Sequence, residues 1–112
     1  MKTWIHLMVL LFALQSANAD WPKFRGPAGD GTWDCPGLPL AIDDPERKWK
    51  RAIGGGYSGI TIADERVYTM DRPAGKEVER VICLDANSGD LIWEHEYPAD
   101  YKGLDYGRGP GR

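Results

Sequence analysis

After residue 47 the chain is a succession of short β-like runs that alternate with turn residues. The runs are rich in β-branched and aromatic residues and lie at 48–53, 59–63, 66–70, 78–84 and 91–97. With 14 Gly and 8 Pro residues, the sequence is interrupted too often for long helices. It therefore predicts an all-β fold, with a four-stranded antiparallel meander from about Ile60 to Tyr97 and an extra strand at 48–53.

The turn between the last two runs has the most specific chemistry. Its sequence is Asp85-Ala86-Asn87-Ser88-Gly89-Asp90. An Asp side chain can accept hydrogen bonds from the backbone amides that follow it, and a Gly can adopt positive φ at no steric cost. We therefore expect Asp85 and Gly89 to shape a tight turn.

Two features indicate how the strands are covered. The run 81–84 is apolar on both alternating faces, which is typical of strands in stacked sheets, either propeller blades or a sandwich. Trp49 and Trp93 lie 44 positions apart. That spacing matches one propeller blade of roughly 40–45 residues and favours a propeller.

The first nineteen residues have the pattern of an export signal. Lys2 precedes an apolar core at 7–14, and small residues stand at Ala17 and Ala19. The apolar run ends at Gln15, short of the roughly 20 residues that a membrane span needs. We expect cleavage after Ala19, a periplasmic or secreted mature chain, and no membrane span after cleavage. A net charge of −3 argues against a nucleic-acid surface.

The two cysteines allow two interpretations. Export permits a disulfide between Cys35 and Cys83, which would tie the irregular arm at 20–46 to the β-rich part at 47–112. Alternatively, Cys83 is a small buried hydrophobe within its strand. If the disulfide forms, a self-sufficient small β domain is a further hypothesis.

Three segments resemble the PQQ (pyrroloquinoline quinone) repeat β-propellers of the bacterial secreted type. They are Leu84-Asp85-Ala86-Asn87-Ser88-Gly89-Asp90-Leu91-Ile92-Trp93, the preceding strand pair at 59–70, and Trp21-Pro22-Lys23-Phe24-Arg25-Gly26-Pro27 just after the signal. The resemblance implies that 60–97 forms one blade, with Asp85, Gly89, Trp93 and Trp49 as its structural repeat residues.

In such a propeller the Trp of the outer strand docks against the next blade, which assigns that role to Trp93. The strand 48–53 would close the ring beside the last blade, and 98–112 would begin the next repeat. A propeller has about 4–8 blades. We therefore expect the chain to be an N-terminal fragment of the ring.

The motifs that carry chemistry in other proteins are incomplete here. The G-x-G-x-x-G spacing at 54–59 leads into a strand, whereas a dinucleotide loop must open a helix. His95 has no second His beside it, and the spacing of Asp85, Asn87 and Glu96 lacks the Gly that a calcium loop needs. We therefore expect no catalytic, cofactor-binding or metal residues.

The resemblance also includes quinone-dependent dehydrogenases. For these enzymes the resemblance implies a PQQ cofactor that is held between a Trp and a disulfide of two adjacent cysteines, together with a calcium ion. Cys35 and Cys83 are not adjacent. We therefore expect a non-catalytic binding or scaffold module without PQQ, whose partner is an unknown protein or small molecule. The alternative is the N-terminal part of a periplasmic PQQ-dependent dehydrogenase.

Overall fold

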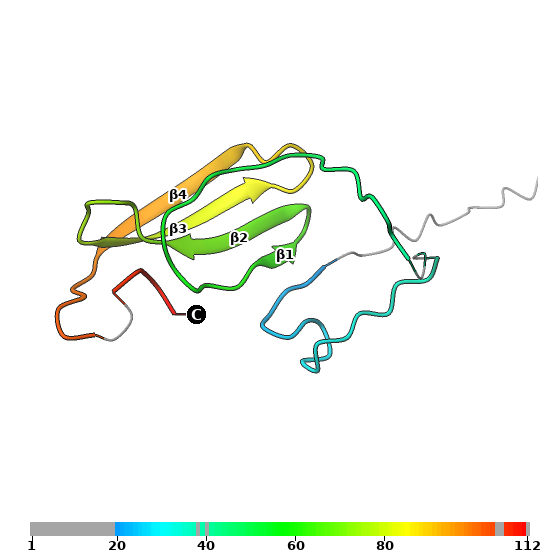
Figure 1. Ribbon diagram of the computed structural model, residues 1–112, viewed down its shortest axis with the longest axis horizontal. Helices are drawn as coiled ribbons and strands as arrows, with labels where there is room; N and C mark the ends of the chain where they lie inside the picture. Colours follow the sequence, from blue (N-terminus) through cyan, green and yellow to red (C-terminus); the bar gives the residue numbers. More distant parts are fainter. Residues whose placement is uncertain (1–19, 38, 40, 105–106, 112) are drawn as a thin grey trace, which may run out of the picture.

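The computed structural model describes residues 20–37, 39, 41–104 and 107–111. Its strands are β1 (Thr61–Ala63), β2 (Arg66–Asp71), β3 (Val78–Asp85) and β4 (Leu91–Pro98). They form one antiparallel sheet in the order β1-β2-β3-β4 (Figure 1). The expected all-β meander is confirmed, and the sheet is open, with β1 and β4 at its edges. The described segments contain no helix that could cross a membrane.

The β1–β2 hairpin turns through two residues that adopt left-handed backbone conformations. Asp64 has a φ of 50° and Glu65 a φ of 59°. Two consecutive positive φ values are the geometry of a type I′ turn, whose twist matches that of the flanking strands. The turn therefore explains how a strand as short as β1 is held in register with β2.

One face of the sheet, here called the covered face, carries the core. Cross-strand pairing places Val67 opposite Leu84 and Thr69 opposite Ile82. Val67, Ile82 and Leu84 are only 7%, 2% and 3% exposed. Trp49 and Ala86 are among the partly buried residues that pack against them. The residues of the covered face alternate along each strand, as the side-chain period of a strand requires.

The segment 48–53 does not form the strand that the sequence predicts. Residues 47–54 contain no strand in the structure, and the segment runs from the β3–β4 turn across the sheet towards the end of β2 (Figure 1). Its contacts to the sheet are made by side chains: Trp49 packs on the core, and Arg51 Nη1 donates to the carbonyl of Gly89 at 3.3 Å. Without a neighbouring strand to pair with, the apolar side chain of Trp49 determines where the segment lies.

The other face carries two aromatic side chains with Cys83 between them. The pairing aligns Tyr68 with Cys83 and Cys83 with Trp93. Cys83 is fully buried between these neighbours, whereas Trp93 is 42% exposed. A β-bulge lies between Cys83 and Leu84, so Ile92 on β4 has no residue opposite it. The outer strand β4 therefore leaves much apolar surface uncovered.

The N-terminal arm docks on the opposite edge of the sheet. Trp21 pairs with Ile62 of β1: the amide of Trp21 donates to the carbonyl of Ile62 at 2.8 Å, and the reverse bond is 2.9 Å long. The Trp21 ring then covers Gly26, where a Cβ would lie 2.6 Å from the ring. The arm therefore extends the sheet by one bridge before it turns away.

Candidate functional site

The Asp85–Asp90 turn has the expected geometry. Oδ1 of Asp85 accepts hydrogen bonds from the amides of Asn87 and Ser88, each at 2.8 Å. The bonds from Ser88 and Asn87 lower the pKa of Asp85, because they stabilise its charged form. Gly89 has a φ of 75°, and its amide donates to the carbonyl of Asp85 at 2.9 Å.

The structure brings Trp49, one of the two tryptophans that lie 44 positions apart, to this turn. Nε1 of Trp49 donates to the carbonyl of Ala86 at 2.9 Å, and the indole ring lies against Gly89. Trp93 lies on the other face of the sheet, where its ring centroid is 6.1 Å from that of Tyr68. Trp49 therefore belongs to the core of this sheet, and Trp93 belongs to its uncovered surface.

A buried ion pair at the end of β2 could not be seen in the sequence. Asp71 is fully buried and accepts two hydrogen bonds from Arg80, at 2.9 and 2.6 Å, and one from the amide of Gly54. Burial raises the pKa of Asp71, but the bonds from Arg80 and Gly54 outweigh it and hold the pKa below its ordinary value. Nη1 of Arg80 also bonds Glu94 at 3.2 Å.

The glycines at 54–56 allow backbone to pack on backbone. A Cβ at Gly54 would overlap the carbonyl of Arg72, and a Cβ at Gly55 would overlap that of Arg108. The amide of Tyr57 donates to the carbonyl of Pro110 at 2.8 Å. Gly55 and Gly56 therefore allow the segment 107–111 to pack closely on the chain. The glycine run leads into an extended segment, so it provides no helix N-terminus to hold a phosphate.

A second cluster fixes the segment that follows β4. Glu79 accepts hydrogen bonds from the hydroxyls of Tyr97 and Tyr101. Burial and the bond to Glu79 raise the pKa of Tyr101 to about 12. The guanidinium of Arg72 lies 4.2 Å from the centroid of the Tyr101 ring and donates to the carbonyl of Gly107 at 2.7 Å. Arg72 therefore connects β2 to two parts of the C-terminal segment.

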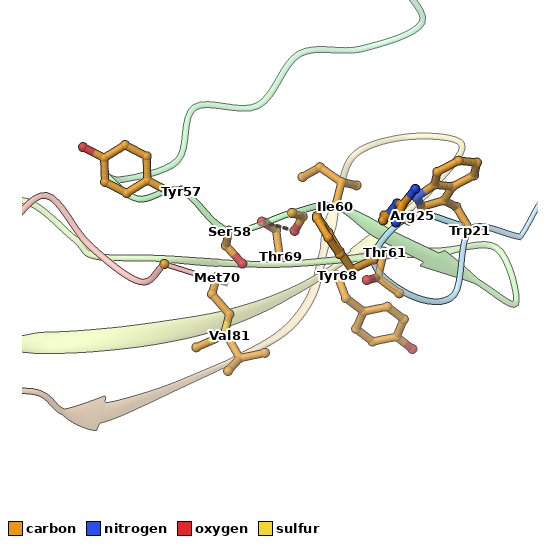
Figure 2. A pocket seen from close by; sticks show the side chains of 13 residues that line it. Trp21, Arg25, Tyr57, Ser58, Ile60, Thr61, Tyr68, Thr69, Met70 and Val81 are labelled. Carbon is orange, nitrogen blue, oxygen red and sulfur yellow. Dashed lines mark hydrogen bonds between the residues drawn. The ribbon is translucent and has the colours of Figure 1, made fainter. Parts of the chain in front are cut away.

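An open groove of about 1030 Å³ lies beside β1. Residues from the arm, from the segment entering β1, from β2 and from β3 line it, together with Gly111. Figure 2 shows Trp21 and Arg25 together near one end and Tyr57 near the other, with Ile60 and Tyr68 between them. Aromatic rings and hydroxyls dominate the lining. Small-molecule sites typically have volumes of roughly 300–1,000 Å³, and this groove lies close to the upper end of that range.

Arg25 occupies a costly backbone position at this groove. The amide of Gly26 donates to the carbonyl of Lys23 at 2.9 Å, which closes a turn with Arg25 in its third position. There Arg25 has a φ of 66°. This is the position at which type II turns favour Gly, and a side chain in the left-handed region costs about 1–2 kcal/mol. Sequence reasoning missed Arg25 because its conformation is not visible in the residue pattern.

A quinone site of the kind that the resemblance implies does not fit these residues. Cys35 is half-buried in the arm, Cys83 is buried in β3, and both thiols are free. Among the described residues there is no group of three His, Cys, Asp or Glu side chains that could hold a metal ion. His95 is exposed on β4, with its ring centroid 6.3 Å from that of Tyr97.

No protein-family model, curated protein or solved structure matches this chain.

Proposed function

We propose that the chain is part of an exported PQQ-repeat β-propeller and that its ring is a non-catalytic binding or scaffold module. The observation that carries this proposal is the apolar exposure of β4. Leu91, Ile92 and Trp93 are 41%, 45% and 42% exposed on consecutive positions of one strand. A repeat unit buries such a surface against its neighbours, and a neighbouring blade would cover it here.

The order of the strands supports the same proposal. Each strand pairs with its neighbour in sequence, from the short edge strand β1 to the outer strand β4. This is the order of the four strands in a propeller blade. The repeat residues Asp85 and Gly89 have clear roles in the β3–β4 turn, which explains why a repeat would carry them.

The alternative is the N-terminal part of a periplasmic PQQ-dependent dehydrogenase. The positions of Cys35 and Cys83 give it no support. A titration of the complete propeller protein with PQQ and Ca²⁺ distinguishes the two functions, because this chain would form only part of the ring. The binding or scaffold proposal expects no saturable quinone absorbance and no reduction of an added redox dye, whereas both signals would support the dehydrogenase.

Export rests on the sequence of residues 1–19, which lie outside the described residues. Expression of the complete chain in a bacterial host provides the test. Mass spectrometry of the periplasmic or secreted fraction should find a product that begins at Asp20. Retention of the intact N-terminus in the cell would contradict this part of the proposal.

The blade itself is tested by the association state of the purified chain. With Leu91, Ile92 and Trp93 uncovered, residues 20–112 should self-associate in sedimentation velocity at micromolar concentration. The double variant Ile92→Gln and Trp93→Gln should be monomeric. Replacing exposed Asp90 and His95 by Gln is the matched control and should leave the association unchanged. A strictly monomeric wild-type chain would contradict a neighbour-dependent blade.

A further inference from the structure

The groove beside β1 combines a cation with apolar walls. Among the described residues that line it, Arg25 is the only charged one, and none of them carries a carboxylate. Nη2 of Arg25 donates to the carbonyl of Asp30 at 3.3 Å. Within the described segments no ion pair involves Arg25, so its remaining N–H donors can serve a ligand.

The aromatic side chains near Arg25 provide surfaces for a flat ring. In Figure 2 the indole of Trp21 lies beside Arg25, and Thr61, Ile60 and Tyr68 follow along the groove. Tyr and Trp rings bind aromatic groups in offset or edge-to-face contacts. A guanidinium at one end and aromatic walls beyond it together match a ligand with one anionic end and one aromatic body.

The backbone of Arg25 is a second and independent observation. Its positive φ lies in a turn position that Gly fills without strain. Strained positions of this kind persist where the side chain has a role that a relaxed residue cannot fill. The backbone strain at Arg25 and the position of Arg25 in the groove therefore both indicate a functional role for its side chain.

We propose that this groove binds a small aromatic carboxylate. Its carboxylate pairs with the guanidinium of Arg25, and its ring lies among Trp21, Ile60 and Tyr68. The described residues that line the site all come from this one chain, so the purified chain is sufficient for the test. Binding is a simple association, with no bond made or broken.

The test uses the purified chain and two probes of equal size. Equilibrium dialysis measures the binding of 2-naphthoate and of its neutral analogue 2-naphthalenemethanol. A charge-assisted bidentate contact should make the carboxylate bind about tenfold or more tightly than the alcohol. Absence of saturable naphthoate binding, or equal affinity for the two probes, would overturn the proposal.

Arg25→Gly separates binding from folding. The variant relaxes the turn, so hydrogen-exchange protection of β3 should stay the same or rise, while naphthoate binding should fall to the level of the alcohol. Arg25→Lys should keep part of the preference. Lys23→Gln removes one positive charge from the same turn without touching the groove lining and should change nothing. Full naphthoate affinity in Arg25→Gly, or an equal loss in Lys23→Gln, would refute a role for Arg25.

Discussion

The indole ring of Trp49 lies so close to Gly89 that a Cβ at Gly89 would come within 2.6 Å of ring atom Cδ2. The two residues are 40 positions apart in the sequence, and their contact joins the segment 48–53 to the β3–β4 turn. Nε1 of Trp49 is bonded to Ala86 in the same turn. Because Gly89 has no side chain, the turn can adopt its left-handed backbone conformation and the Trp49 ring can pack directly on the Gly89 backbone.

Replacing Gly89 by Ala should destabilise the sheet in two ways. Alanine at positive φ costs about 1–2 kcal/mol, and its Cβ must also displace the Trp49 ring. Gly75→Ala is the matched control, because Gly75 has a φ of 74° but no atom within 4 Å of an added Cβ. Hydrogen exchange of the β3 amides should accelerate clearly more in Gly89→Ala than in Gly75→Ala. Equal effects would mean that Trp49 moves aside freely.

The strand pattern could be predicted because it depends on local sequence. Alternating apolar residues and turn chemistry placed all four strands of the meander within two residues of their observed bounds. The prediction for 48–53 was wrong for a physical reason. A segment with high strand propensity forms a strand only where another strand can pair with it. Here the segment 48–53 lies across the sheet with Trp49 packed on the core, and it pairs with no strand.

The candidate site could be predicted only in part. Asp85 and Gly89 were found because their roles depend on residues within the same turn. The buried charge of Asp71 and the strain at Arg25 depend on tertiary partners or on backbone angles, which one sequence does not reveal. Glycines at 54–56 were visible as a pattern, but the backbone that packs on them comes from residues 72 and 108.

The Asp71–Arg80 pair should make stability fall in acid. The folded pKa of Asp71 lies below its unfolded value of about 3.9. Its contribution is therefore complete above that unfolded value and disappears as the pH falls through the lowered folded pKa. Asp71→Asn should lose about 1–3 kcal/mol at neutral pH, and the gap between the two proteins should close in acid. Hydrogen exchange and tryptophan fluorescence between pH 2 and 6 measure this gap; a gap that is independent of pH would contradict the assignment.

The tyrosine cluster around Glu79 should be visible in an alkaline titration. The bond to Glu79 raises the pKa of Tyr97, and burial and the bond to Glu79 raise the pKa of Tyr101 to about 12. Absorbance at 295 nm should therefore show a late ionisation step near pH 12 from Tyr101. Because the folded pKa exceeds the unfolded value of about 10, this contribution is complete below pH 10 and is lost as the pH rises further. Tyr101→Phe should remove the late step, and Glu79→Gln should shift it towards pH 10. A wild-type curve without a late step would exclude the cluster.

Arg72 should hold the segment 107–111 in place. Arg72→Met removes the hydrogen bond to Gly107 and the contact with the Tyr101 ring, which together are worth about 1–2 kcal/mol. The amide of Tyr57, which donates to Pro110, should then exchange roughly tenfold faster. Arg66→Met removes an exposed arginine from the start of the same strand and should leave the Tyr57 amide unaffected. Unchanged exchange in Arg72→Met would show that the glycine contacts alone hold the segment.

The β1–β2 turn offers a stabilising substitution. Glu65 has a φ of 59° in the second central position of a type I′ turn, where Gly is preferred. Glu65→Gly should therefore stabilise the hairpin by about 1 kcal/mol and slow the exchange of the β2 amides by several-fold. Asp90→Gly is the opposite control, since Asp90 has no positive φ and the added flexibility should cost about 0.5–1 kcal/mol. Faster exchange in Glu65→Gly would show that the Glu65 side chain stabilises the turn by more than its backbone strain costs.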